Sequence, residues 1–182
     1  MESNTIDKWI DYQGKEFLKN IGIRKNHFVL DFGCGHGTYS IPASLLVGDK
    51  GRIYAVDNNK KSLDELMQRA EKRGLKNIQR IDVTEGIKIS LKKESVDAVL
   101  LYDVIHLIDN RHDLLIEIHR VSKQNALISV FPKHHQEYMN MKLESVKDEI
   151  ESAGFSFKKE IYKILMHNDC LEKDYVLNFR KK

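Results

Sequence analysis

The sequence predicts an α/β fold: a doubly wound, mostly parallel sheet of seven strands that ends in an antiparallel hairpin. Three observations predict it. Short apolar runs alternate with amphipathic stretches of helical spacing over residues 28–154. The first apolar run, Phe28–Phe32, leads directly into a glycine-rich loop. The last two strand-like segments have no helix between them, which favours a hairpin.

Residues 5–21 are expected to form an amphipathic helix. Its apolar residues fall roughly on one face: Ile6, Trp9, Ile10, Phe17 and Leu18. Gly14 weakens the middle of this helix, so a break into two pieces stays open. After the strand Phe28–Phe32, a helix is expected at residues 38–47, with Pro42 tolerated near its start.

The remaining elements follow in alternation. Arg52–Asp57 predicts a second strand, and Gly74 closes the helix expected at residues 60–73. The later strands are expected at residues 77–83, 96–102, 126–131, 155–165 and 175–179, and the later helices at residues 110–122 and 141–153. Residues 167–169 read as the turn of the hairpin.

Length and composition predict a single domain over residues 1–182, with an N-terminal helical cap at 1–22 on a core at 28–182. The 41% hydrophobic and 31% charged content is that of a globular protein, and a net charge of +3 does not indicate nucleic-acid binding. No signal peptide or membrane span is expected. The two cysteines form no disulfide framework or zinc motif, which favours the cytoplasm.

The loop after the first strand, residues 33–38, reads GCGHGT. Its glycines let the backbone approach a ligand at the start of a helix. A dinucleotide site wants G-x-G-x-x-G, whose third glycine allows close packing of helix and strand. Here Thr38 takes that place, which disfavours a dinucleotide, and no GxxxxGK[ST] is present to make a P-loop.

Four motifs in order carry a resemblance to a known family. The first is Asp31-x-Gly33-x-Gly35-x-Gly37 after an apolar strand, and the second is Asp57 at the end of the next strand. The segments VDAVLLYDVIHLID and LLIEIHRVSKQNALISVF supply the others. Over residues 28–131 the chain resembles class I S-adenosylmethionine-dependent methyltransferases, and it is most similar to the small-molecule branch that includes the ubiquinone/menaquinone methyltransferases.

The resemblance implies a Rossmann-like site for S-adenosyl-L-methionine, with S-adenosyl-L-homocysteine as the product. In this site Asp31 would fix the loop and approach the methionine ammonium, and Asp57 would accept hydrogen bonds from the two ribose hydroxyls. Asp82 and the Val83 N–H would bind the adenine. The implied cofactor-binding residues are Asp31, Gly33, Cys34, Gly35, Gly37, Asp57, Asn58, Asp82, Val83 and Tyr102, the last beside the methionine.

These acids also have a purely structural interpretation, because strand ends are rich in Asp as caps and turn residues. The ligand interpretation is favoured for Asp57 and Asp82, and the two stand level for Asp31. Cys34 is explained as a small residue in the loop. The family commonly has Lys-Pro-Gly-Gly before the fifth strand, where this chain reads KQNA. Asn125 can adopt the left-handed conformation, so the turn is expected to survive.

Methyl transfer from a sulfonium is an in-line displacement in which positioning and desolvation contribute much of the catalysis. A general base is needed only where the accepting atom carries a proton. His106 and His134 are the catalytic candidates, because histidine suits proton transfer near neutral pH, although an exposed loop position is the simpler interpretation of each. Further candidates at this edge are Tyr102, Asp103 and His135. The adjacent His134 and His135 would point to opposite faces, so no metal is expected.

The expected function is therefore S-adenosylmethionine-dependent methyl transfer to a small-molecule acceptor. A non-catalytic cofactor-binding module, acting as a sensor or partner subunit, is the alternative, and an NAD-type dehydrogenase is a third hypothesis. The substrate cover would come from the N-terminal helix, with Trp9 and Tyr12, and from residues 132–141. The acceptor, its accepting atom, the oligomeric state and any partner are left open.

Overall fold

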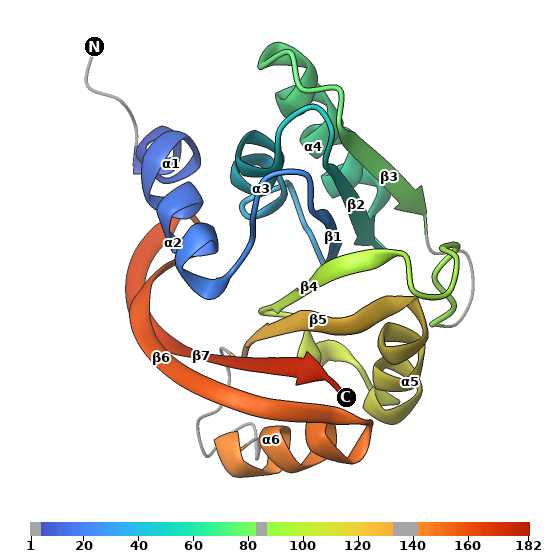
Figure 1. Ribbon diagram of the computed structural model, residues 1–182. Coiled ribbons are helices and arrows are strands. Elements are labelled where there is room, and N and C mark those ends of the chain that lie inside the picture. The colour runs from blue at the N-terminus through green and yellow to red at the C-terminus, as the bar shows by residue number, and fades with distance from the viewer. Residues whose placement is uncertain (1–4, 83–86, 133–141) are drawn as a thin grey trace.

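The computed structural model describes residues 5–82, 87–132 and 142–182. One seven-stranded sheet runs in the order β3-β2-β1-β4-β5-β7-β6, which confirms the predicted fold class (Figure 1). Neighbours among β1 to β5 pair in parallel, whereas β7 is antiparallel to both β5 and β6. The strands are β1 (Phe28–Phe32), β2 (Arg52–Asp57), β3 (Ile78–Asp82), β4 (Val96–Tyr102), β5 (Ser122–Phe131), β6 (Phe155–His167) and β7 (Cys170–Lys181).

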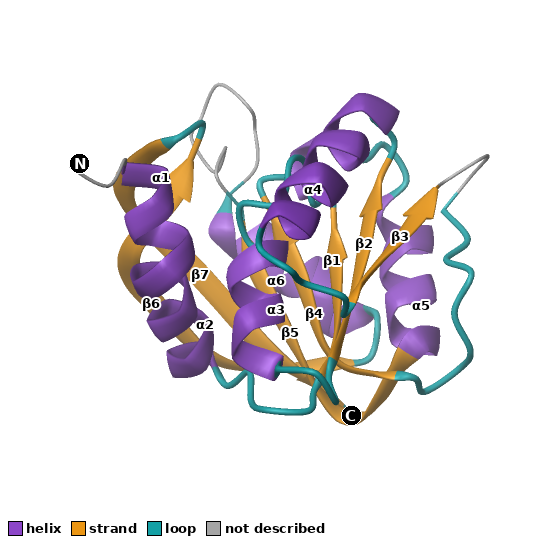
Figure 2. Ribbon diagram, turned by 90° about the horizontal axis from the view of Figure 1, so that it is seen from above, coloured by secondary structure: helices purple, strands orange, loops and turns teal. Residues whose placement is uncertain are grey.

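Helices cover both faces of this sheet (Figure 2). They are α1 (Thr5–Lys8), α2 (Gly14–Ile21), α3 (Ser40–Val47), α4 (Lys60–Lys72), α5 (Arg111–Val121) and α6 (Leu143–Ser152), with short turns η1 (Trp9–Gln13) and η2 (Ile105–Leu107). Successive strand residues point to opposite faces. Val29 therefore packs into a core with α2, α3 and α4, whereas Leu30 packs into a second core with α5 and α6.

The N-terminal helix is interrupted by a π-helical turn, η1, immediately before Gly14. A Cβ on Gly14 would lie 2.9 Å from the Trp9 carbonyl and 3.1 Å from its indole, so glycine lets the Trp9 ring fold back along the helix. The buried indole N–H then donates to the Thr38 carbonyl at 3.0 Å. Trp9 thus ties the N-terminal segment to the turn before α3 and is not an exposed cover residue.

Two element boundaries differ from expectation for identifiable reasons. Residues 38 and 39 form a turn, so α3 begins at Ser40. β5 begins directly after α5 at Ser122, four residues before the expected start. Asn125 has a φ of 62°, which confirms the left-handed conformation expected where the family commonly has glycine. The strand ladder continues on both sides of this irregularity.

The hairpin at the C-terminal end is longer than predicted. His167 is paired with Cys170, so only Asn168 and Asp169 form the turn, with φ values of 47° and 61°. Two residues of positive φ match the twist of the flanking strands. The ladder therefore extends to the tip, and β7 starts at Cys170, not at residue 175.

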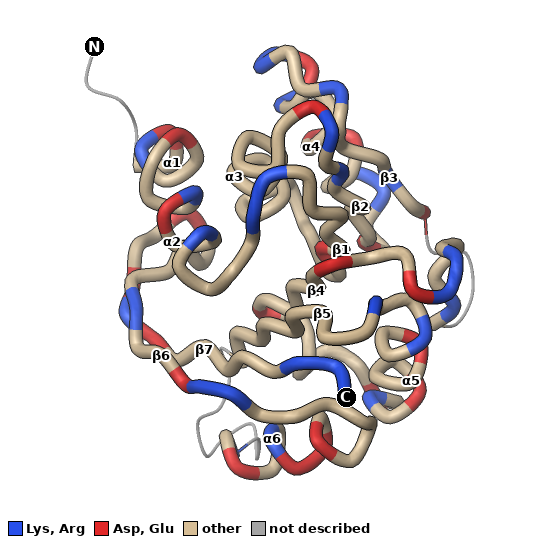
Figure 3. Tube along the Cα trace, viewed as in Figure 1, with Lys and Arg blue, Asp and Glu red and all other residues tan. Residues whose placement is uncertain are grey.

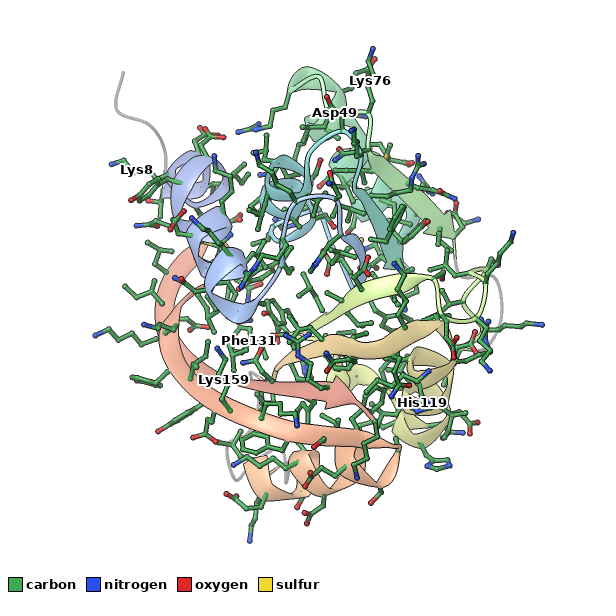
Figure 4. The ribbon with its side chains drawn as sticks, in the orientation of Figure 1. Lys8, Asp49, Lys76, His119, Phe131 and Lys159 are labelled. Atoms are coloured by element: carbon green, nitrogen blue, oxygen red, sulfur yellow. The ribbon has the colours of Figure 1, made fainter. Side chains whose placement is uncertain are left out.

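The sheet order reverses at β1, with β2 on one side and β4 on the other. In open α/β sheets, ligands bind at such a point, beyond the carboxyl ends of the strands. Charges of both signs are interspersed along the described chain (Figure 3). The labelled side chains of Lys8, Asp49 and Lys76 point outward, whereas Phe131 lies inside (Figure 4). No described helix is long and apolar enough to cross a membrane.

Candidate functional site

The glycine loop at the end of β1 is held by hydrogen bonds from its neighbours. The N–H groups of Gly33 and Cys34 both donate to the Val56 carbonyl on β2, at 2.8 and 3.0 Å. Arg69, on α4, donates to the His36 carbonyl at 3.0 Å. The loop is therefore held from β2 on one side and from α4 on the other.

The three glycines of this loop have positive φ values, but each lies in different surroundings. A Cβ on Gly33 would lie 2.4 Å from a methyl of Val104, and one on Gly37 would lie 2.3 Å from a methyl of the buried Leu66. A Cβ on Gly35, by contrast, would meet nothing within 4 Å. Gly33 and Gly37 allow close packing of the protein, whereas Gly35 presents bare backbone to open space.

Asp57, at the end of β2, supports the same loop. Its Oδ2 accepts from the Gly35 N–H at 2.8 Å and its Oδ1 accepts from the Asn59 N–H at 2.8 Å. An ionised carboxylate has about four lone-pair positions, so each oxygen can accept a further hydrogen bond. Asp57 can thus order the loop and bind hydroxyl groups at the same time.

Asp31 lies beneath the loop, with only 2% of its surface exposed. Ser40, the first residue of α3, donates to its Oδ2 at 2.5 Å. Burial raises the pKa of Asp31 to about 7, and the hydrogen bond from Ser40 opposes this only in part. A carboxyl with such a pKa changes charge near neutral pH, and a cation placed beside it would favour the ionised form.

A cavity of about 230 Å³ opens between the ends of β1, β2 and β4. Its walls are mostly apolar and its polar side is Asp57 with Asn58; the lining residues are Phe32, Gly33, Val56, Asp57, Asn58, Ile87, Val104, Leu107 and Ile108. Sites for drug-sized ligands measure about 300–1,000 Å³, so this cavity suits one flat, mostly apolar part of a ligand. The apolar run after β4 was the sequence signal for this cavity wall, and the sequence analysis did not use it.

A larger hollow of about 480 Å³ lies at the opposite, amino-terminal edge of β2 and β3. Its central polar residue, Asn77, is occupied by hydrogen bonds to Ser44 and to the Gly48 carbonyl. Asn77 therefore stabilises the fold at that edge. The hollow itself lies away from the glycine loop.

Asp82 and Val83 were predicted to bind the adenine. Asp82 lies in register with Asp57 and is held by Arg80, whose Nε is 3.0 Å from both carboxylate oxygens. This hydrogen bonding lowers the pKa of Asp82. Asp82 is not among the described residues that line the cavity, and Val83 lies outside the described residues.

Tyr102 and Cys34 are both buried at this edge. The Tyr102 hydroxyl lies 2.8 Å from the Ser129 hydroxyl, and its ring packs edge-on against Tyr39 at 4.5 Å between centroids. Burial raises the pKa of both Tyr102 and Cys34. A thiol that keeps its proton is a poor nucleophile, which supports a packing role for Cys34.

Of the two histidines predicted to be catalytic, the structure describes His106 but not His134. The His106 side chain is 8% exposed, and its Nδ1 lies 3.9 Å from Asp103 Oδ1. His134 and His135 lie outside the described residues, as does the cover segment expected after Pro132. Within residues 5–82, 87–132 and 142–182, no group of three metal-binding side chains is found.

The tip of the β6–β7 hairpin also reaches this edge, which the sequence analysis did not predict. The Tyr39 hydroxyl donates to the Met166 carbonyl at 3.0 Å and accepts from the Met166 N–H at 3.2 Å. His36, in the glycine loop, lies 3.4 Å from Asp169 in the hairpin turn. The sequence signal for this position of the hairpin tip was the pair of turn residues 168–169. A two-residue turn there extends β6 to His167.

Comparisons with known proteins agree with this geometry. A family model described as a methyltransferase domain matches residues 23–175. The probable cobalt-precorrin-6B C(15)-methyltransferase (decarboxylating) of Saccharolobus solfataricus is 38% identical over 85 residues, which are 46% of this chain and 43% of that protein. The demethylmenaquinone methyltransferase of Lactobacillus johnsonii is 24% identical over 116 residues, 64% of this chain and 48% of that protein.

Both matches span less than half of the relative's own length. Among solved structures, a SAM-dependent methyltransferase from Aquifex aeolicus has the same fold, with a TM-score of 0.74 at 23% identity, over 96% of this chain and 91% of the other. The family match covers most of the chain, including the glycine loop and the five parallel strands. The chain therefore belongs to the methyltransferase domain family.

Proposed function

We propose that this protein is an S-adenosylmethionine-dependent methyltransferase that acts on a small-molecule acceptor. The observation that carries the proposal is the open space over Gly35, next to an Asp57 carboxylate that is ordered by two backbone N–H groups. Bare backbone beside a fixed acid suits a nucleoside with two hydroxyls. The two relatives reported above are named as methyltransferases of a cobalt-precorrin and of demethylmenaquinone, which are small molecules, and this supports a small-molecule acceptor.

The residues present fit this cofactor. Asp57 would accept hydrogen bonds from the ribose hydroxyls, and the apolar wall of the cavity, with Ile87 and Leu107, would contact the adenine. Asp31 would balance the methionine ammonium from beneath the loop. Asp82 and Val83 remain proposed contacts of the adenine amine and ring, Asn58 and Cys34 remain proposed contacts in the loop region, and Tyr102 remains the proposed neighbour of the methionine.

The cofactor would supply an electrophilic methyl group on a sulfonium. The chain's own residues would bind it, fix its orientation and exclude water, which is much of what an in-line transfer requires. The loop supports this, because hydrogen bonds from β2 and α4 hold it with the Gly35 backbone beside open space. We also propose the cytoplasm as the location, since both cysteines are free thiols. Nucleic acid is not the expected acceptor.

Two measurements test this function. Titration calorimetry is expected to show binding of S-adenosylmethionine and S-adenosylhomocysteine but not of NADH. Mass spectrometry is then expected to detect methylation in a panel of phenols, thiols, amines and carbon acids. The panel includes RNA as a separate arm. Methylation of RNA alone would refute the small-molecule proposal.

Two other outcomes separate the alternatives. Binding of the cofactor without transfer to any acceptor would favour the non-catalytic module. Binding of NADH in place of the adenosyl cofactor would overturn the assignment of the site and favour a dehydrogenase.

A further inference from the structure

The hairpin tip brings an imidazole to the first residue after β4. His167 Nε2 lies 2.8 Å from Asp103 Oδ2, and its Nδ1 lies 3.3 Å from Glu172 Oε1. The same Nε2 lies 3.2 Å from the side-chain amide nitrogen of Asn168, so the tautomer of the His167 ring decides whether Nε2 donates to Asp103 or accepts from Asn168. The cluster thus forms an ordered row of acid, imidazole and acid that joins β4 to the hairpin.

Asp103 is held in an unfavourable backbone conformation at this place. Its φ is 54°, a left-handed value that is uncommon for residues other than glycine. Its N–H donates to the Phe131 carbonyl at 3.0 Å, and its side chain is held by His167. Non-glycine residues with such backbone conformations cluster at functional sites. The next residue, Val104, lines the cavity and contacts Gly33.

The Asp103 side chain is partly exposed. Its exposed fraction is 29% and Oδ1 is buried, so the exposed area lies on the remaining side-chain atoms. A carboxylate oxygen can accept two hydrogen bonds. Oδ2 can therefore take a proton from a bound acceptor while it keeps its contact with His167.

We propose that Asp103 accepts the proton that the methyl acceptor loses, and that His167, backed by Glu172, is the positioning residue that holds the Asp103 carboxylate. This inference rests on the proposed function. The accepting atom forms a bond to the methyl carbon, and the carbon–sulfur bond breaks with its electron pair on sulfur. The proton of the accepting atom passes to Asp103 Oδ2 and from there to water, so the step balances without a further reactant.

Several groups face the Asp103 carboxyl from the elements packed against it. Among the described residues these are His106 from η2, His167 from β6, with Glu172 of β7 behind it, and Tyr39 from the turn before α3. The side chains around Asp103 therefore come from segments that are far apart in the sequence.

The experiment compares two acceptors: a phenol, which is protonated at pH 7, and a thiophenol, which is ionised there. With the phenol, Asp103→Asn is expected to lower kcat about 100-fold and His167→Gln about tenfold. KM and the Kd of S-adenosylhomocysteine stay within about twofold, so the loss in both variants is confined to kcat. Because the ionised thiophenol has no proton to lose, its methylation stays unchanged in both variants.

His112→Gln, an exposed histidine on α5, is the matched control and leaves both acceptors unaffected. Equal losses with the phenol and the thiophenol would overturn the proposal, because they would indicate a structural defect. Glu172→Gln is expected to reproduce part of the His167→Gln loss, and Glu172→Asp to restore part of the rate.

A measurement without an acceptor tests the geometry directly. NMR of ¹⁵N-histidine protein saturated with S-adenosylhomocysteine is expected to show a ring N–H of His167 that exchanges slowly with water. This signal disappears in His167→Gln and shifts in Asp103→Asn. A rapidly exchanging His167 ring in the wild type overturns the proposal. Failure of the wild type to bind S-adenosylhomocysteine would instead refute the proposed function, so the two failures are distinguishable.

Discussion

The Asp57 carboxylate accepts a hydrogen bond from the Gly35 N–H at 2.8 Å, and this contact links the end of β2 to the glycine loop after β1. The second carboxylate oxygen accepts from the Asn59 N–H, at the start of α4. One side chain thus orders three segments around the space over Gly35. The acid expected to bind a ribose is also the residue that shapes the loop beside it.

Asp57→Ala is expected to weaken cofactor binding strongly. The variant loses the proposed hydrogen bonds to the ribose and leaves the Gly35 N–H without its acceptor. Hydrogen bonds to charged groups contribute about 1.5–3 kcal/mol each, so the Kd of S-adenosylhomocysteine should rise at least about tenfold. Calorimetry measures this. Asp49→Ala, in an exposed turn at the opposite edge, is the control. An unchanged Kd in Asp57→Ala would refute the assignment of Asp57 to the cofactor site.

Gly35→Ala and Gly37→Ala are expected to fail in different ways. A methyl group at residue 35 meets only open space, so this variant folds with a loss of about 1–2 kcal/mol from its left-handed φ, but it blocks the cofactor. A methyl group at residue 37 collides with buried Leu66, which should cost roughly 3 kcal/mol. Thermal melts and calorimetry on both variants separate the two effects. Normal cofactor affinity in Gly35→Ala would contradict this site.

Asp31 is expected to make stability depend on pH. Its pKa rises from 3.8 in the unfolded chain to about 7 in the fold, so the folded carboxyl binds its proton more tightly. Stability is therefore highest below about pH 4 for this group and falls as pH rises to about 7, by roughly 4 kcal/mol at most. Asp31→Asn should remove this decline. Urea denaturation at pH 4, 5.5 and 7 tests it, and parallel profiles would contradict it.

Tyr39→Phe is expected to loosen the hairpin tip. The variant leaves the N–H and the carbonyl of Met166 without the hydroxyl that bonds both of them in the native protein. Buried backbone groups without partners cost about 1–3 kcal/mol, which urea denaturation would detect. Hydrogen exchange should increase at the tip of the hairpin and not in β1. Tyr12→Phe, at a side chain that is 68% exposed, should leave both measurements unchanged.

Much of the architecture followed from local chemistry. The apolar run Phe28–Phe32, the glycines after it and Gly74 at the end of α4 each specify a conformation that depends on a few neighbouring residues. Asn125 is such a case, because its short side chain tolerates the left-handed region wherever it stands. The order of helices and strands and the position of the glycine loop could therefore be predicted without coordinates.

The amino-acid sequence by itself determined the doubly wound sheet, the loop at the end of β1 and the acid at the end of β2, because each depends on spacing along the chain. Only the tertiary structure decided that Gly35, not Gly33 or Gly37, faces open space, and that His167 meets Asp103 from 64 residues away in the chain. The reason is physical: pairing of β7 with β5 carries the hairpin tip back to the site, and no local pattern encodes where a distant strand ends.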